Sequence, residues 1–244
     1  MQHLLRYKVV FYILGFIICP LLSKAQLRDG INLPEHDDKN IHFGINLGLN
    51  RAHFSFTHHP LFLQRDSVMV VESINSTGLN LAWLVDKRLS EHFNIRTFPL
   101  DLTFTEKAFE YTLKYPSTIG GGEDTVTIKK IQSISLTFPL QLKFSSDRIG
   151  NFKVYMMGGG KVEFDMASNA GARKAENLIK LNRLDYGIEA GLGFHFYYPY
   201  FVLTPELKVG WGLGNLHARD KDLKFSNVID KINSRTITFS LTVE

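Results

Sequence analysis

Eight stretches of the chain alternate apolar and polar residues with a period of two, each over about 10 to 16 positions. In "ISLTFPLQLKF", for example, Ile134, Leu136 and Phe138 share one face, while Ser135 and Thr137 share the other. Successive side chains of a β-strand point to opposite faces, so this period predicts strands with one apolar and one polar face. The predicted strands cover residues 41–50, 76–86, 93–104, 134–144, 154–166, 184–197, 201–214 and 234–243.

The connections between these strands alternate strictly between short and long. The short ones lie near residues 89–92, 146–150 and 198–200. The long, polar ones lie near residues 58–72, 106–127, 167–182 and 215–231. Outer-membrane barrels combine an even number of antiparallel strands with short periplasmic turns and longer outside loops. The sequence therefore predicts an all-β fold: an eight-stranded antiparallel up-and-down transmembrane β-barrel over residues 41–244, with both termini in the periplasm and the long loops at the cell surface.

The polar face contains mostly small residues, and this decides which face points inward. A soluble barrel of the lipocalin type would bury its apolar face. Here the polar face is rich in Gly, Ser, Thr and Asn and carries few charges of both signs. Small side chains suit the narrow interior of an eight-stranded barrel, whereas a water-exposed outer wall would carry many Lys and Glu residues. We therefore expect the apolar face to contact lipid and the polar face to line the lumen.

The stretch "VYMMGGGKVEFDM" shows this assignment in detail. Val162, Phe164 and Met166 are expected to face lipid, between charged residues that face the lumen. Unpaired charges in a narrow interior are costly, so we expect a paired, hydrogen-bonded network. Its predicted members are Arg96, Asp101, Lys143, Lys161, Glu163, Asp165, Asp185, Glu189, Glu206 and Lys208.

Two smaller features fit the same architecture. The strand over residues 93–104 changes parity at Pro99: the apolar residues Phe93 and Ile95 are at odd positions, whereas Leu100 is at an even one. A β-bulge would explain the change. An aromatic cluster at a short turn is expected to form a membrane-interface girdle. It consists of Tyr197, Tyr198, Tyr200 and Phe201.

The first 25 residues have the pattern of a secretory signal. Arg6 and Lys8 precede an apolar run that closes with the small residues Ser23 and Ala25. Removing residues 1–25, which hold three cations and no acid, lowers the formal net charge from +4 to +1 and removes the single cysteine. No basic stripe then indicates nucleic-acid binding, and no thiol or cysteine metal site is left. Residues 26–40 are expected to form a periplasmic N-terminal segment.

Few residue groups suggest chemistry. His58–His59 could bind a metal, and His195 shares the lumen face with Glu189 and Asp185 as in a lipid-modifying enzyme, but a surface loop and a packed histidine are the simpler interpretations. Residues Gly158–Gly160 lack the spacing of a phosphate loop and are read as close-packing positions. Residues Gly120–Gly122 are expected at a loop tip, and 169–183 as a short helix. We expect no catalytic residues, no metal and no cofactor.

Five segments together resemble a known family. They are "GLNRAHFSFTHHP", "DSVMVVESINSTGLNLAWLV", "FNIRTFPLDLTFTEKAFEYTLKYP", "VYMMGGGKVEFDMASNAGARKAENLIKLNR" and "VIDKINSRTITFSLTVE". These segments resemble the PorT (SprT) family of Bacteroidetes outer-membrane proteins. The resemblance spans about residues 41–244 and implies a non-enzymatic accessory component of the type IX protein secretion system, which exports cargo bearing a C-terminal domain and, in gliding species, serves motility.

The resemblance also implies which partners to expect. These are other type IX secretion subunits in the outer membrane or periplasm, within a lipid and lipopolysaccharide environment. The long loops 106–127 and 167–182 are the first candidate contact surfaces, because loops on a rigid scaffold often carry recognition. Residues 26–40 are the second. The alternatives are a small structural or adhesive barrel and a lipid-modifying outer-membrane enzyme.

Overall fold

The computed structural model describes residues 30–59, 68–114, 125–166, 181–218 and 229–244. Gly30 and Ile31 belong to a separate N-terminal unit, and residues 32–244 form the unit discussed below. The expected signal, the loop tip at Gly120–Gly122 and residues 169–180 of the expected helix lie outside the described residues. Leu181, at the end of that expected helix, instead forms an isolated antiparallel bridge with His217.

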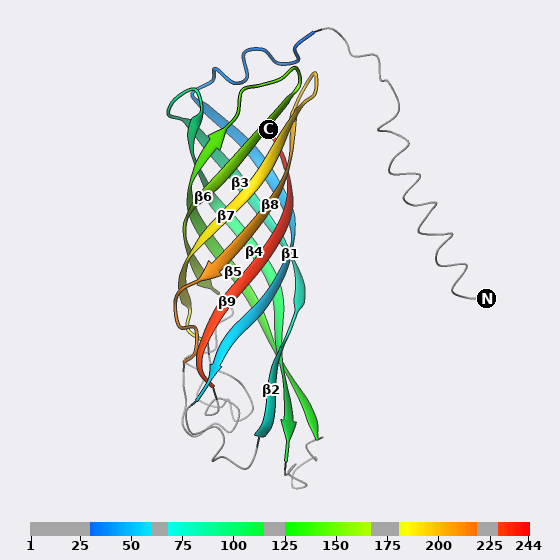
Figure 1. Ribbon diagram of the computed structural model, residues 1–244, viewed down its shortest axis with the longest axis vertical. Coiled ribbons are helices and arrows are strands. Elements are labelled where there is room, and N and C mark those ends of the chain that lie inside the picture. Colours follow the sequence, from blue (N-terminus) through cyan, green and yellow to red (C-terminus); the bar gives the residue numbers. More distant parts are fainter. Residues whose placement is uncertain (1–29, 60–67, 115–124, 167–180, 219–228) are drawn as a thin grey trace, which may run out of the picture. The chain divides into compact units, whose positions relative to one another are not determined.

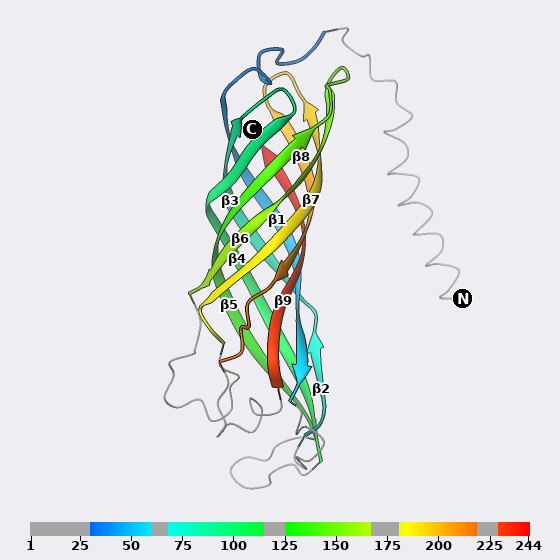
Figure 2. The ribbon, with the colours of Figure 1, turned by 60° about the vertical axis from the view of Figure 1, so that its left-hand side comes forward.

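Eight antiparallel strands close into a barrel, as predicted (Figures 1 and 2). Each strand pairs with its neighbour along the chain, β9 pairs with β1, and a β4–β5 pairing completes the ring. In the described part of the chain, no helix is both long and apolar enough to cross a bilayer. The barrel strands are β1 (Ile41–His58), β3 (Ser76–Arg88), β4 (Phe93–Leu113), β5 (Val126–Ser145), β6 (Phe152–Asp165), β7 (Leu184–Tyr197), β8 (Val202–Gly212) and β9 (Ile229–Val243).

The barrel wall has its apolar side chains outside and its polar side chains inside. Along β1, Ile45 and Leu47 are about 60% exposed, whereas Asn46 between them is fully buried. This distribution is the reverse of that in a water-soluble protein, and it suits a barrel whose outer wall contacts lipid. The predicted assignment of the two faces is therefore confirmed.

The predicted parity change in the third barrel strand is a β-bulge. Thr97 of β4 lies opposite Val85 of β3, while Leu100 lies opposite Trp83, so β4 holds one extra residue there. Pro99 and Leu100 are both exposed, and Phe98 before them is fully buried in the lumen. Because Pro99 has no N–H to donate, the bulge places it where ladder pairing is already interrupted.

A ninth strand, β2 (Val68–Ile74), was not predicted. It begins in the connection 58–72, which the sequence analysis expected to be a loop, ends two residues beyond it, and pairs with β4 from Ala108 to Leu113. The expected loop 106–127 is also shorter than predicted, since β4 runs to Leu113 and β5 starts at Val126. β2, β4 and β5 therefore continue past the rest of the barrel as a three-stranded sheet at the long-loop end (Figure 1). The outer part of β4 supplies the hydrogen-bond partners that allow this short segment to form a strand.

The two faces of the strands exchange character at this end of the barrel. We call this region the extension; it consists of β2 and of the parts of β1, β4, β5 and β9 that lie beyond Leu49, Phe104, Ile134 and Ile237. Outward residues change from Leu49 to Arg51 in β1 and from Phe104 to Glu106 in β4. Inward residues become apolar, and they form a buried cluster that Phe56 packs against. The cluster consists of Phe54, Val71, Phe109, Tyr111, Leu113, Leu181, Leu216, Ile229 and Ile232. Because an outer wall turns polar where hydrocarbon gives way to water, this exchange marks the membrane boundary at the long-loop end.

Gly159 shows why the glycine run in β6 is a packing feature. A Cβ atom at this position would collide with the carbonyl oxygen of Leu140 on β5. On the next strand, a Cβ atom at Gly193 would collide with the ring of Tyr155, which lies over it. The missing side chains thus let β5, β6 and β7 approach closely and make room for one large aromatic ring inside a narrow lumen.

Candidate functional site

Arg96 is the centre of an ion cluster in the lumen near the short-turn end. Its guanidinium pairs with Glu206, lies 3.1 Å from Asp86 and lies 3.6 Å from a carboxylate oxygen of Glu244. Lys143 donates to the same Asp86 oxygen at 2.5 Å. These side chains are almost completely buried. Such a cluster is stable only because its opposite charges face one another at hydrogen-bonding distance.

Residues missed by the sequence analysis complete this cluster. Asp86 lies on the expected polar face of its strand but was not assigned to the network. Tyr155 donates to Glu206, accepts from Arg96 at 3.2 Å and has its ring 4.7 Å from that of His195. The signal that could have found Tyr155 is its parity, since it shares the inward face of β6 with Lys161. Because Tyr155 is aromatic, the sequence analysis did not include it among the polar residues of the lumen.

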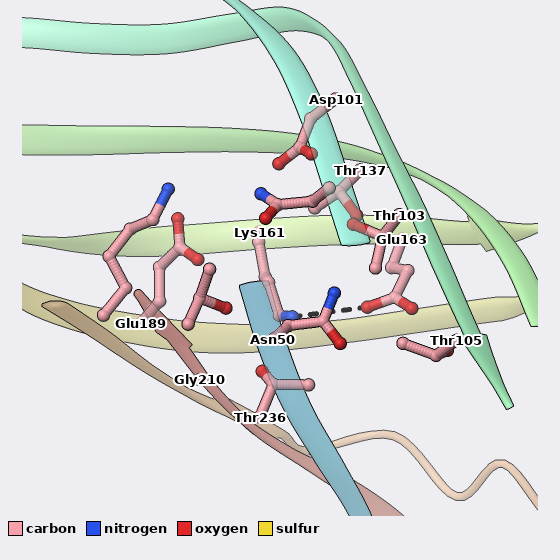
Figure 3. Close-up of a pocket in the computed structure, with 13 residues that line it drawn as sticks. Asn50, Asp101, Thr103, Thr105, Thr137, Lys161, Glu163, Glu189, Gly210 and Thr236 are labelled. Carbon is pink, nitrogen blue, oxygen red and sulfur yellow. Dashed lines mark hydrogen bonds and ion pairs between the residues drawn. The ribbon is translucent and has the colours of Figure 1, made fainter. Parts of the chain in front are cut away.

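A second group of charges surrounds a small cavity at mid-lumen (Figure 3). The cavity has a volume of about 40 Å³ and also touches several threonines and Asn50. That volume accommodates about two or three water molecules. Within the described part of the chain, the buried amide of Asn50 has no hydrogen-bond partner, so water in the cavity would satisfy it. The charged residues that line the cavity are Asp101, Lys161, Glu163, Glu189 and Lys208.

Most of the predicted lumen charges fall into two groups, the Arg96 cluster and the cavity group, which one ion pair connects. Lys161 lies 3.3 Å from Glu163, and Lys208 lies 3.9 Å from Glu206, which links the cavity to the Arg96 cluster. Asp165 accepts a hydrogen bond from Ser133 at 3.0 Å. Asp185 also lies on the inner wall and accepts hydrogen bonds from the backbone N–H groups of Tyr186 at 2.9 Å and Gly214 at 3.2 Å.

The possible catalytic residues on β7 are not brought together. The His195 imidazole is buried and hydrogen-bonds the hydroxyl of Thr204 at 2.8 Å. Glu189 accepts instead from the Gln141 amide. Six residues of strand separate His195 from Glu189, which corresponds to about 20 Å. In this geometry the two side chains cannot act on one substrate atom.

Residues Asn32–Asn40 fold against the short-turn end of the barrel. The carboxylate of Asp37 accepts a hydrogen bond from the Tyr197 hydroxyl at 2.7 Å and lies 3.4 Å from Lys153 and 3.6 Å from Arg148. His36 stacks on the ring of His42, with 4.6 Å between centroids. Side chains of this part of the expected periplasmic segment 26–40 thus lie against this end of the lumen, and its role as a contact surface stays a prediction.

Tyr197 consequently does not belong to an outward aromatic girdle. It has the inward parity of β7, is 4% exposed, and has the guanidinium of Arg148 3.6 Å from its ring centre. The other three predicted girdle residues point outward: Tyr198, Tyr200 and Phe201. The cluster was read as one surface although consecutive strand residues face opposite sides.

Acidification should release the segment Asn32–Asn40 from the barrel. Burial lowers the pKa of His36 to about 4, so the docked segment holds this imidazole neutral. Because the folded pKa is below the ordinary value of 6.5, the stabilisation is complete above pH 6.5 and is lost as the pH falls toward 4. Amide hydrogen exchange of residues 32–40 should accelerate across this window, after correction for the intrinsic rate.

A His36→Phe variant provides the control, because it keeps a ring against His42 but cannot gain a proton. Its exchange should respond much less over the same pH range. The response left in this variant should appear only at lower pH, where Asp37 is protonated. Burial disfavours the ionised form of Asp37, but Tyr197, Lys153 and Arg148 outweigh it and hold the pKa below its usual value. Equal pH responses in both proteins would exclude His36 as the titrating group.

The histidine pair that could have bound metal lies where β1 ends, at His58 and His59. Among the described residues, the potential ligand atoms that do come within 4.8 Å of one another are elsewhere, at the short-turn end. They belong to Glu91, His92 and Asp147, which are exposed or half-exposed. Exposed acidic groups of this kind commonly occur without a bound metal.

One protein family matches the chain, and several solved structures are similar to it. The family described as "Outer membrane protein beta-barrel domain" matches residues 24–218. Among solved structures, the chain is similar to Neisserial surface protein A, with 9% identity, a TM-score of 0.43, and 84% of this chain and 99% of that chain covered. OprG from Pseudomonas aeruginosa is 12% identical, with a TM-score of 0.45, and 82% of this chain and 93% of that chain are covered. Ail of Yersinia pestis, in complex with a heparin analogue, is 12% identical, with a TM-score of 0.39, and 84% of this chain and 99% of that chain are covered. No curated protein matches the sequence.

Proposed function

Because the chain belongs to the outer membrane protein beta-barrel domain family, we propose that it is a small, non-enzymatic outer-membrane barrel that anchors a binding surface above the membrane. In this proposal the extension is at the cell surface and the short-turn end is in the periplasm. The orientation follows the general rule for outer-membrane barrels, whose longer loops are outside.

A filled lumen supports a binding role over a transport role. The Arg96 cluster obstructs the barrel near the short-turn end, and residues 32–40 cover that end. The cavity at mid-lumen holds only a few water molecules. Passage of a solute would require several buried ion pairs to open at once, and passage of an unfolded protein would require the barrel itself to break.

The observation that carries the proposal is an apolar surface on the outward face of the extension. Val70 and Val126 flank Thr112 of β4 on its two sides, and Ile128 follows Val126 along β5. All three apolar side chains are between 42% and 50% exposed, although they lie beyond the boundary where the outer wall turns polar. Exposed apolar residues on a rigid sheet in water are typical of protein-binding surfaces.

The specific process we propose is type IX secretion, with the protein as an accessory component that contacts other secretion subunits through this surface. The support for this finer step is the sequence resemblance to the PorT family. The resemblance spans about residues 41–244, so it includes the extension together with the barrel strands. Two of its segments, "DSVMVVESINSTGLNLAWLV" and "FNIRTFPLDLTFTEKAFEYTLKYP", contain all of β2 and all of β4.

A structural or adhesive barrel is the second candidate function, and the same exposed apolar surface favours it. An adhesive surface would contact molecules outside the cell instead of subunits of the secretion system. The two candidates differ in what is lost when the surface is changed: export of cargo in the first, and attachment of cells in the second.

The deciding experiment deletes the gene and measures cargo with the C-terminal domain in the medium and the periplasm. We expect cargo to accumulate in the periplasm and export to return with the wild-type gene. A Val70→Ser/Ile128→Ser variant should fail to restore export although its barrel inserts normally. Correct insertion is read from the mobility shift of the unheated protein on gels.

The matched control is Leu89→Ser/Ile149→Ser, which removes two exposed apolar residues from the short turns at the other end. It should restore export fully. If only the control variant fails, the contact surface is periplasmic and the extension is not involved. Normal export in the deletion strain would exclude the secretion role, and reduced attachment of the same strain would support the adhesive one.

A further inference from the structure

The outer wall carries a compact group of cations just beyond the membrane boundary. On β1 the outward residues change from Leu49 to Arg51 and His53. On β9 the outward residues change from Ile237 to Arg235. Both changes occur at the level where hydrocarbon ends, which is the level of the lipid phosphate groups.

Strand register brings these cations together. Arg235 lies directly opposite His53, and Arg51 lies opposite Ile237, which places Arg51 diagonal to Arg235. Opposite and diagonal neighbours on one face of a sheet lie within about 5 to 8 Å at Cβ. On the other side of β9, Arg235 is opposite Trp211 of β8, an outward indole 39% exposed. Tryptophan beside basic residues is typical of the membrane–water interface.

No acid neutralises this group within the part of the chain that the structure describes. Arg51 and Arg235 are exposed and form no ion pair with a described residue. The pKa of His53 is lowered, first by its partial burial and then by the positive charges of Arg235 and Arg51. His53 thus experiences a net positive field from its two neighbours. Such a field attracts an anion.

On β4 the outward residues beyond the boundary include acids instead. The first of them is Glu106, and Glu110 lies four residues further along the strand. A nonspecific basic belt around the whole barrel would not show this difference. A positive patch beside an acidic one favours a discrete anionic ligand in one orientation.

We propose that Arg51, His53 and Arg235 bind a phosphate group of an outer-leaflet lipid, of the lipid A type, with Trp211 packed along its acyl chain. The apolar wall below the cluster contacts the rest of the lipid. This inference depends on the orientation proposed above, but it does not depend on a role in secretion.

The test uses the purified full-length barrel in detergent micelles, with lipid A and enzymatically dephosphorylated lipid A as probes. Binding is followed by native mass spectrometry. The wild-type protein should bind the phosphorylated form about thirtyfold more tightly, since each of the two arginines near a lipid phosphate contributes about 1 kcal/mol. Arg51→Gln/Arg235→Gln should lose this preference.

The matched control is Lys39→Gln/Lys87→Gln, which removes two exposed cations at the short-turn end. It should bind like the wild type. Equal binding of both lipid A forms by the wild-type protein would overturn the proposal, as would unchanged binding by the arginine variant. Competition by millimolar inorganic phosphate would identify a site for free phosphate, and a preference for phosphatidylglycerol would identify an inner-leaflet site. Each of these results contradicts an outer-leaflet lipid, whether or not cargo export is normal.

Discussion

Replacing Arg96 by methionine should strongly destabilise the folded barrel. The change keeps much of the side-chain volume but removes the charge that faces Asp86, Glu206 and Glu244. Lys143 can still pair with Asp86, whereas Glu206 retains the hydroxyl of Tyr155 and, as its one described cation, Lys208 at 3.9 Å. Breaking a buried ion pair by removing one partner costs about 3–5 kcal/mol, which is a large part of the stability of a domain.

Urea unfolding in micelles, followed by the gel mobility shift, measures this loss. Arg88→Met is the matched control, because Arg88 forms a more exposed pair with Asp38 at 2.9 Å, and such pairs contribute at most about 1 kcal/mol. A second variant, Arg96→Met/Glu206→Met, should recover part of the stability, since it removes a stranded carboxylate together with the cation. An unchanged urea midpoint for Arg96→Met alone would show that the cluster does not stabilise the fold.

Replacing Phe109 by aspartate should disrupt the extension and leave the membrane barrel intact. Phe109 is fully buried and stacks on Phe54, with 5.2 Å between ring centroids, and contacts Phe56 edge-on at 5.5 Å. Truncating a buried Phe costs about 3–5 kcal/mol, and placing a carboxylate in the same position adds its desolvation. The loss of stability should remain local, because Phe109 lies in the extension, beyond the part of β4 that closes the membrane barrel.

Limited proteolysis of intact cells tests this expectation. The variant should be cut within residues 54–74 or 105–133, while the core of the barrel remains protected and keeps its mobility shift. Thr112→Asp, on the outward face of the same strand, is the control and should resist proteolysis like the wild type. If Phe109→Asp instead prevents insertion altogether, the extension and the barrel fold as one unit. Protection equal to that of the control would mean that the apolar cluster does not hold the extension.

The sequence by itself determined which residues line the lumen and which face lipid. This was possible because the alternation of side chains is a local property of a strand, and a membrane requires every outward position to be apolar. The same rule located the bulge at Pro99 and the number of strands in the barrel. At Tyr197 residue type was followed and parity was correct, and Tyr155 was not assigned to the lumen although its parity is inward.

Only the tertiary structure decided which lumen residues meet. Arg96 and Glu206 are 110 positions apart, and their contact depends on how eight strands are staggered when the barrel closes. β2 exists because the outer half of β4 offers it hydrogen-bond partners, and residues 32–40 are ordered because Tyr197, Lys153 and Arg148 converge on Asp37. Alternation in sequence fixes the direction of a side chain, whereas its partner is set by closure of the ring, which no local pattern encodes.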